Sequence, residues 1–258
     1  MGLGPQTARM SWFRKPRPVE SPVLVVDALG VSERIASCDS GALSELADEL
    51  DQQFYSFSSR LPNRLVIATR SSVFSSRQFS SLRLNDMFVA FSTKAMPDPV
   101  LGYLVAASML YHQLLLAGFI ARGGLGFGTV LRRRDMILGN GFLDAYRASE
   151  RRSDLTKHVC AIEVTPRLLA QIPNCERAWR LLCFYNDRFF VNPTCLVDPD
   201  MGEFTAERIL GLLKSSGVNG EKRSATAEFL EKLEDYDAAS RPGSRSRDFT
   251  RRALSDER

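Results

Sequence analysis

The sequence predicts an α+β fold in which a split β-α-β arrangement is built around an antiparallel central sheet. Short apolar runs alternate with stretches of helical periodicity, and their order reads strand, helix, two strands, helix, strand. With 258 residues, 44% hydrophobic and 25% charged, the chain suits one globular domain with appendages. We place the domain at 21–200, between a flexible extended arm at 1–20 and a helical extension at 201–237, with a disordered basic tail at 238–258.

The first expected strand is the continuous apolar run Val23–Val26, a pattern typical of a strand that is covered on both faces. Apolar side chains then recur at helical spacing from Leu43 to Phe57. This spacing predicts an amphipathic helix over 41–57, with Ser40 as its N-cap.

Two strand-like segments, 79–85 and 87–92, flank Asp86 and predict a hairpin with that carboxylate at its tip. The apolar stretch Leu101–Ile120 follows, and it is long enough to raise a membrane-spanning alternative. Polar side chains such as His112 lie in its middle, where burial in lipid is unfavourable, and no second span follows. We therefore expect a buried core helix.

The second half begins with a glycine-rich segment, 121–131, which predicts a strand that another backbone or a ligand approaches closely. A Thr-Pro pair at 165–166 supplies an N-cap and a proline at the first position of a helix. The remaining expected elements are strands at 135–138, 158–164 and 188–193 and helices at 142–150 and 225–236.

Composition excludes several classes of protein. The net charge of +4 comes largely from the two ends, so no basic stripe with interleaved aromatic residues predicts a stable nucleic acid partner. Five cysteines form no C-x-x-C pair, and their odd number does not indicate a disulfide framework. The first twenty residues lack the apolar stretch of a secretory signal. We expect a cytoplasmic protein without a membrane span.

Asp27 and Asp86 each stand where a short apolar strand meets a turn. Two carboxylates at strand ends are able to meet in space and hold divalent cations. Oxygen ligands suit Mg²⁺ or Mn²⁺, and these ions normally leave open positions for substrate phosphates. The pair therefore predicts phosphate chemistry.

Four blocks in this order resemble the catalytic domain of class III nucleotidyl cyclases. They are Asp27–Ser32, the hairpin tip Asn85-Asp86-Met87, the glycine-rich strand Arg122–Gly128, which is similar to R-x-G-[IL]-x-x-G, and Gly139–Arg147, which is similar to G-x-x-V-N-x-A-x-R. The resemblance covers about residues 22 to 165 and implies the ferredoxin-like βαββαβ fold of that family.

The resemblance also implies roles for individual residues. Asp27, the Ala28 carbonyl and Asp86 hold two ions, Mn²⁺ or Mg²⁺, per site. Backbone N–H groups of Gly30, Val31 and Ser32 bind the triphosphate, and Arg147 stabilises the transition state. The family works as homodimers with sites at the interface, so Arg147 is expected to come from the opposite subunit.

Three positions depart from the purine cyclases. Leu143 replaces the transition-state asparagine, while Leu82 and Met136 replace the lysine and aspartate that select a purine. The first carboxylate segment, VVDALGVS, and an A-Y-x-x-x-E helix over 145–150 resemble the pyrimidine cyclases of bacterial Pycsar antiphage systems. Those enzymes make cyclic UMP or cyclic CMP, which acts on a separate effector. The sequence does not decide between UTP and CTP, and we favour UTP.

Two other classes of function stay open. Because Leu143 stands at a catalytic position, a degenerate cyclase-like sensor that binds a nucleotide without turnover is one alternative. A nucleic-acid-binding adaptor that works through the basic chain ends is the other. Arg147 itself also has a structural interpretation, as a surface residue paired with Glu150 at i, i+3.

Overall fold

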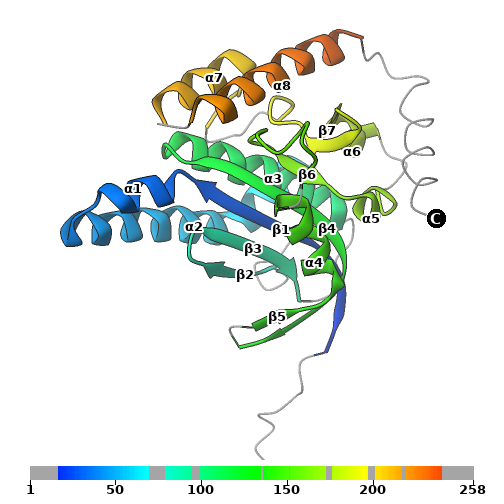
Figure 1. Ribbon diagram of the computed structural model, residues 1–258. Helices are drawn as coiled ribbons and strands as arrows, with labels where there is room; N and C mark the ends of the chain where they lie inside the picture. The colour runs from blue at the N-terminus through cyan, green and yellow to red at the C-terminus, as the bar shows by residue number, and fades with distance from the viewer. Residues whose placement is uncertain are drawn as a thin grey trace, which may run out of the picture.

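The computed structural model describes residues 17–69, 79–93, 99–134, 136–150, 152–172, 176–196, 201–216 and 219–239. Its elements are β1 (Val19–Leu29), α1 (Val31–Ser37), α2 (Ser40–Thr69), β2 (Phe79–Leu84), β3 (Met87–Ser92), α3 (Pro99–Leu116), β4 (Ile120–Arg133), β5 (Met136–Leu138), α4 (Asn140–Glu150), β6 (Ile162–Val164), α5 (Pro166–Leu169), α6 (Glu176–Arg180), β7 (Leu182–Tyr185), β8 (Arg188–Val191), α7 (Ala206–Ser215) and α8 (Gly220–Ala239). The predicted α+β class is confirmed (Figure 1).

The strands form one sheet in the order β2-β3-β1-β4-β6-β8-β7, with β5 paired to β4. The first four strands are antiparallel to their neighbours and, with the helices between them, form the expected ferredoxin-like βαββαβ core. The expectation of an antiparallel sheet is wrong at one junction, because β4 and β6 pair in parallel. Strand β7, which no sequence pattern predicted, closes the far edge by pairing with β8.

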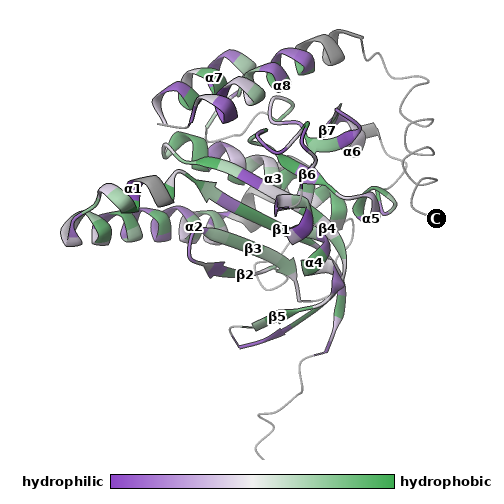
Figure 2. Cartoon of the chain, viewed as in Figure 1, coloured by the Kyte–Doolittle hydropathy of each residue, from purple (hydrophilic) through white to green (hydrophobic). Residues whose placement is uncertain are grey.

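Strand β1 lies at the centre of two hydrophobic clusters. The side chains of Val23–Val26 are all 0% exposed, which confirms a strand covered on both faces. Leu24 and Val26 pack in the large cluster with helices α2 and α3, while Val23 and Val25 pack in a smaller one with Ala145 of α4. Figure 2 shows hydrophobic residues along these central strands and hydrophilic turns on α7 and α8.

Helix α3 is the buried core helix that the apolar stretch predicted. Residues 102–115 are buried along its whole length, among them Tyr103 and Met109 at 0% exposure. Its His112 stacks on Phe204 with ring centroids 3.7 Å apart, which fastens the C-terminal part of the chain to the core. None of the helices that the structure describes is both long enough and apolar enough to cross a membrane.

Helix α2 differs from its prediction at both ends. Asp39, not Ser40, caps its N-terminus, since the Asp39 carboxylate accepts a hydrogen bond from the Ala42 N–H at 2.8 Å. The helix also continues to Thr69, well beyond the expected end at residue 57. The apolar period stops at Phe57, but backbone hydrogen bonding does not require that period to continue.

A row of glycines lets α4 lie directly on the backbone of β4. A Cβ atom on Gly124 would stand 2.1 Å from the Ala145 carbonyl oxygen, and one on Gly126 would stand 2.6 Å from the Ala145 nitrogen. The predicted close approach is therefore confirmed, and what approaches is a helix backbone. This close packing sets the distance between α4 and the sheet and the rotation of the helix about its own axis.

Two helices, α7 and α8, make up the helical extension that was expected at 201–237. The cysteines of the described residues are free thiols. The expected arm falls mostly on residues 1–16 and the expected tail on 240–258, and both lie outside the described residues, as does Cys175.

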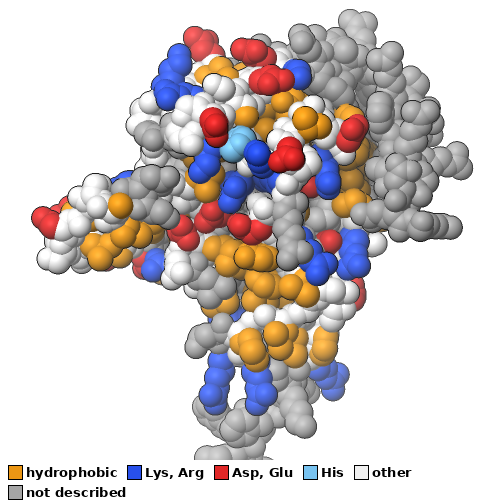
Figure 3. Space-filling view, in the orientation of Figure 1, with side chains coloured by type: hydrophobic (Ala, Val, Ile, Leu, Met, Phe, Trp, Pro, Cys, Tyr) orange, Lys and Arg blue, Asp and Glu red, His pale blue; other side chains and the backbone are white. Residues whose placement is uncertain are grey.

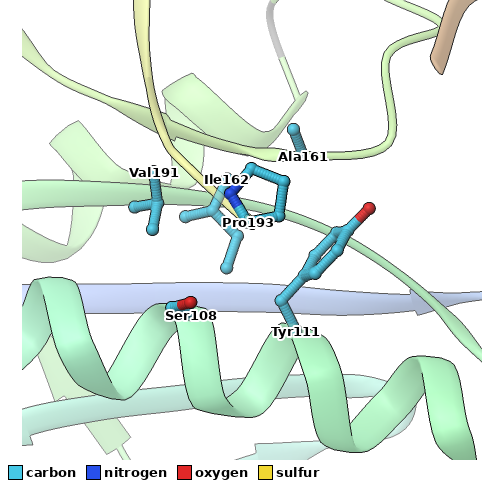
Figure 4. Close-up of a pocket in the computed structure, with 6 residues that line it drawn as sticks. All are labelled: Ser108, Tyr111, Ala161, Ile162, Val191 and Pro193. Atoms are coloured by element: carbon cyan, nitrogen blue, oxygen red, sulfur yellow. The ribbon is translucent and has the colours of Figure 1, made fainter. Parts of the chain in front are cut away.

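A small gap in the core lies between α3 and the second half of the sheet (Figure 4). Ser108 and Tyr111 of α3 face Ile162, Val191 and Pro193 across it, and the space leaves no room for a water molecule. The Tyr111 hydroxyl donates a hydrogen bond to the Cys160 carbonyl at 3.0 Å. The gap is thus a small space between packed elements, and the hydrogen bond of Tyr111 holds the backbone before β6.

Candidate active site

Asp27 lies near the end of β1, in register with Met87 on β3 and Arg122 on β4. The strand ends at Leu29, and the chain turns at Gly30 into helix α1. The Asp27 side chain is 20% exposed, so its carboxylate stands at the edge of the core with access to solvent.

Asp86 comes to the same place from the tip of the β2–β3 hairpin. The hairpin turns through Asn85, which adopts a φ of 57°, a left-handed conformation that asparagine tolerates. The Ala28 N–H donates a hydrogen bond to the Asp86 carbonyl at 3.0 Å. Because the N–H and C=O groups of one residue in an extended strand point to the same side, the Ala28 carbonyl faces this hairpin too.

The two carboxylates influence one another. Burial and the negative charge of Asp86 together raise the pKa of Asp27 to about 6, against the opposing charge of Arg122. Such a repulsive pair of carboxylates is the environment that a divalent cation relieves. The structure therefore brings together the two acidic residues that the sequence singled out.

Arg122 lies between two carboxylates that belong to different elements. Its Nη2 atom is 3.8 Å from Asp27 Oδ2 and 3.5 Å from Glu150 Oε1, at the end of α4. Its Nε–H group is buried and donates no hydrogen bond within the described residues. Both ion pairs are long, so the guanidinium keeps donors for an additional anion.

Glu150 shows that the i, i+3 interpretation of Arg147 is wrong. Among the described residues the ion pair of Glu150 is with Arg122, and none joins it to Arg147. Arg147 is exposed on α4, next to the exposed Leu143 and Tyr146. Its guanidinium is thus presented to solvent or to another molecule, away from the buried face of its helix.

The turn after β1 has the form of an anion-binding helix start. Gly30 has a φ of 92° and is the N-cap of α1, with no side-chain hydrogen bond to the first turn. A Cβ on Gly30 would meet no atom within 4 Å, so space is open beside the turn. The Val31 side chain is buried and fixes the helix, while the Ser32 side chain lies outside the described residues.

These residues fit a divalent cation with few protein ligands. In the part of the chain that the structure describes, no group of three or more His, Cys, Asp and Glu side chains is arranged to hold a metal ion. Asp27, Asp86 and the Ala28 carbonyl could supply oxygen ligands to such an ion. Mg²⁺ and Mn²⁺ suit such a partial set, because they bind one or two carboxylates together with substrate phosphates.

Hydrophobic side chains are exposed beside the acidic residues. On β5 and α4 they are Met136, Leu138, Leu143 and Tyr146, each 39–49% exposed. Figure 3 shows hydrophobic side chains gathered over α4 and β5, below a band of Asp and Glu. We call this set the α4–β5 surface; exposed apolar groups of this kind mark interaction sites.

A larger hollow lies away from the two carboxylates. A depression of about 340 Å³ is lined by Glu20, Gly128 and Asn140 and by Arg167 and Gln171 of the segment around α5. It contains neither Asp27 nor Asp86. This hollow is therefore separate from the carboxylate site.

Sequence reasoning missed the partners of Asp27. Arg122 and Glu150 belong to the sequence motifs, but the motifs predicted no role in the site for either. No pattern predicted Lys222 of α8, whose charge also lowers the pKa of Asp27. The signal for Arg122 was available, because a strand paired with β1 places a residue opposite each residue of β1. Nothing in the spacing indicated Lys222.

No family model matches this sequence, and no curated protein sequence is similar to it. Among solved structures, the chain is similar to the crystal structure of the adenylyl cyclase CyaB from P. aeruginosa, with a TM-score of 0.46 and 11% sequence identity. The similarity covers 68% of this chain and 95% of that one.

Proposed function

We propose that this protein is a metal-dependent nucleotidyl cyclase that converts a pyrimidine nucleoside triphosphate into its 3′,5′-cyclic monophosphate and pyrophosphate. UTP is the favoured substrate and CTP the second. The observation that carries the proposal is the convergence of Asp27 and Asp86 beside the Gly30 turn. A role in antiphage signalling, through a separate effector, follows from the Pycsar resemblance of the sequence.

In this mechanism Asp27, Asp86 and the Ala28 carbonyl would hold two ions, Mn²⁺ or Mg²⁺. When bound, the ions supply Lewis-acid activation of the ribose 3′-hydroxyl and neutralise phosphate charge. The N–H groups at Gly30, Val31 and Ser32 would bind the β and γ phosphates. Together these residues align the 3′-oxygen with the α-phosphorus and the departing pyrophosphate.

Arg122 contributes charge within the same chain. Its guanidinium already stands beside Asp27, and its buried Nε lacks a partner within the described residues. A phosphate oxygen would complete its hydrogen bonding and relax the long contacts to Asp27 and Glu150. The residue thus helps to neutralise the triphosphate next to the cation site.

Arg147 would act from a second copy of the chain. The α4–β5 surface is apolar and exposed, as suits the interface of a homodimer. Arg147 lies on this surface, exposed on α4. In a two-fold dimer it would reach the partner's site and stabilise charge that develops on the α-phosphate.

The residues at the positions of purine selection support a pyrimidine. Leu82 is half-buried and packs with the smaller hydrophobic cluster, and Met136 is 46% exposed on β5. Neither side chain is able to make the hydrogen bonds that distinguish one purine from another. Base selection would therefore depend on shape and on other groups.

The direct test is turnover. Purified full-length protein with Mn²⁺ and each of UTP, CTP, ATP and GTP should yield cyclic UMP as the main product, or cyclic CMP if CTP is the substrate. The Asp86→Asn variant is the matched negative control, because it keeps the hairpin and removes one carboxylate. Tight binding of a triphosphate with no cyclic product from any of the four would favour the sensor instead.

Shared sites have their own test. Asp27→Ala and Arg147→Ala proteins, each inactive, should regain part of the activity when unfolded and refolded together, because a heterodimer contains one intact site. Two copies of the same variant refolded together supply the control. Absence of any recovery, with mixed dimers demonstrated by mass spectrometry, would contradict sites at the interface.

A further inference from the structure

We propose that Lys222 on α8 is a substrate-binding residue that holds the pyrophosphate end of the triphosphate bound at Asp27 and Asp86. The inference rests on the proposed function and extends it, because it makes the C-terminal helix part of the active site. Its ligand is chemically defined: the β and γ phosphates before reaction and the pyrophosphate product after it.

The N-terminal end of α8 is fastened close to the site by hydrogen bonds. Thr226, one turn into the helix and 0% exposed, accepts a hydrogen bond from the Cys160 N–H at 2.9 Å and donates one to the Lys222 carbonyl at 2.7 Å. On the same turn, Glu221 is 3.7 Å from His158 Nε2. The first turn of α8 is thereby held against the segment that precedes β6.

That segment is joined in turn to the strand that carries Arg122. The Ala161 carbonyl accepts a hydrogen bond from the Gly123 N–H at 3.2 Å, and Gly123 follows Arg122 directly. On the other side of the segment, Tyr111 of α3 donates to the Cys160 carbonyl. Since both sides of the segment are anchored, α8 has a fixed place relative to Asp27, and Figure 1 shows its first turn close to the tip of β1.

Lys222 and Arg122 have a buried neighbour in common. The ammonium of Lys222 and the guanidinium of Arg122 both lower the pKa of the Cys160 thiol, which burial raises above its ordinary value. In Figure 3, Lys and Arg side chains gather around a histidine above the band of Asp and Glu. The site therefore has cations on the side of α8 and anions on the side of the hairpin.

The ammonium has no partner of its own within the described residues. Lys222 is half-buried, yet no ion pair or hydrogen bond engages its Nζ atom there. The helix N–H groups beside it are already used, because Asn219 Oδ1 accepts from the N–H groups of Glu221 and Lys222. The Lys222 ammonium is therefore available to form a charge-assisted hydrogen bond with an incoming anion.

The geometry favours the outer phosphates over the base or ribose. The cations at Asp27 and Asp86 would hold the α-phosphate near the ends of β1 and the hairpin, and Arg122 stands beside them. Lys222 comes from a separate element, α8, which contacts the segment before β6 through Thr226 and Glu221, so it would meet a part of the triphosphate away from the hairpin ligand Asp86. An ammonium there neutralises the leaving group as negative charge develops on it.

The experiment measures binding of inorganic pyrophosphate and of uridine monophosphate to full-length protein by calorimetry, in Mn²⁺. In Lys222→Gln, pyrophosphate affinity should fall about tenfold or more, the loss of one charge-assisted contact, whereas uridine monophosphate affinity stays unchanged. Lys222→Arg should retain most of the affinity. The matched control is Arg223→Gln, on the same turn and exposed, which should bind both probes like the unmodified protein.

Each outcome decides the matter. Unchanged pyrophosphate affinity in Lys222→Gln, or an equal loss for both probes, overturns the assignment, and so does unmodified protein that binds no pyrophosphate. Lys222-dependent pyrophosphate binding supports it even if no triphosphate is cyclised, in which case the proposed function fails and the phosphate site stands. If Lys222→Gln cyclises the triphosphate with an unaltered KM and binds pyrophosphate with unaltered affinity, the role of Lys222 is overturned and the proposed function stands. Thermal unfolding of all variants checks that the helix remains docked.

Discussion

Two arginines in neighbouring parts of the fold, Arg152 and Arg122, differ in how completely their charges are satisfied. The Arg152 side chain is 1% exposed, lies 3.8 Å from Glu163, and donates hydrogen bonds to backbone carbonyls of the segment before β6, of β4 and of α4. Arg122 has only two long ion pairs and a buried Nε without a partner in the described residues. The Arg152 guanidinium, which supports the fold, is saturated with hydrogen bonds, whereas the Arg122 guanidinium at the candidate site keeps an unused donor.

The pKa values repeat this contrast. Burial lowers the pKa of Arg152 to about 10, and the charge of Glu163 opposes that shift. The pKa of Asp27 is raised to about 6, first by burial and then by the charge of Asp86, which adds to the shift instead of opposing it. In the first arrangement the opposite charges offset part of the cost of burial, whereas in the second the like charges add to that cost, which a cation and a phosphate would reduce. The repulsion between the Asp27 and Asp86 carboxylates therefore distinguishes the candidate site from the structural Arg152–Glu163 pair.

The largest expected effect is on catalysis. Asp27→Asn should lower cyclase turnover by about a thousandfold or more, since it removes a ligand of the cation site. The same change should stabilise the metal-free protein, because it removes a desolvated carboxylate that faces Asp86. Turnover assays and chemical unfolding of the same samples test both. A variant that is inactive and also less stable would contradict the stored repulsion.

The pH dependence of that stability follows from the raised pKa. The pKa of the Asp27 carboxyl group is about 6 in the folded chain and near 3.8 in the unfolded chain. Between these pH values the folded chain therefore binds more protons than the unfolded chain. This group consequently makes the protein less stable as the pH rises from about 4 to 6. The stability advantage of Asp27→Asn over the unmodified protein should grow across this window. Unfolding titrations at pH 4, 5, 6 and 7 measure it, and a constant difference would contradict the shift.

The next effect is on folding. Arg152→Met should destabilise the protein by about 3–5 kcal/mol, because Glu163 would be left as a buried charge with only the half-exposed Arg188 as partner. The double variant Arg152→Met, Glu163→Gln should recover a large part of that loss, which distinguishes an uncompensated charge from lost packing. Urea unfolding midpoints decide between the two. An Arg152→Met protein as stable as the parent would break the contrast between the two arginines.

Arg122→Gln should change stability little and substrate binding strongly, the opposite of Arg152→Met. We expect a change in unfolding free energy of at most about 1 kcal/mol, because both of its ion pairs are long and partly exposed. Triphosphate affinity should fall about tenfold, the effect of one charge-assisted phosphate contact. Equilibrium binding with a non-hydrolysable UTP analogue provides the measurement. Strong destabilisation with normal binding would place Arg122 among the structural charges.

The smallest effect belongs to the turn. Gly30→Ala should cost about 1–2 kcal/mol of stability, because an alanine at a φ of 92° is strained although the space around it is open. Gly211→Ala, at a helical glycine with equally open surroundings, is the matched control and should not destabilise. Thermal unfolding of the pair separates conformational strain from steric contact.

Local pattern predicted the elements that build the core. The apolar run of β1, the hairpin around Asp86 and the buried α3 follow from periodicity and turn chemistry, which act over a few residues. The capping of α2 by Asp39 in place of Ser40 and its extension to Thr69 escaped prediction. Adjacent cap candidates differ only in the turn geometry that the surrounding chain imposes.

The sequence alone determined that two carboxylates stand at strand ends beside a glycine turn, since apolar runs and turn residues fix where strands stop. Only the tertiary structure decided that Glu150 pairs with Arg122 and not with Arg147, that α4 packs on the glycines of β4, and that α8 docks on the segment before β6 through Thr226 and Cys160. Charge pairing across elements depends on register and packing, which bring together residues whose separation along the chain carries no signal.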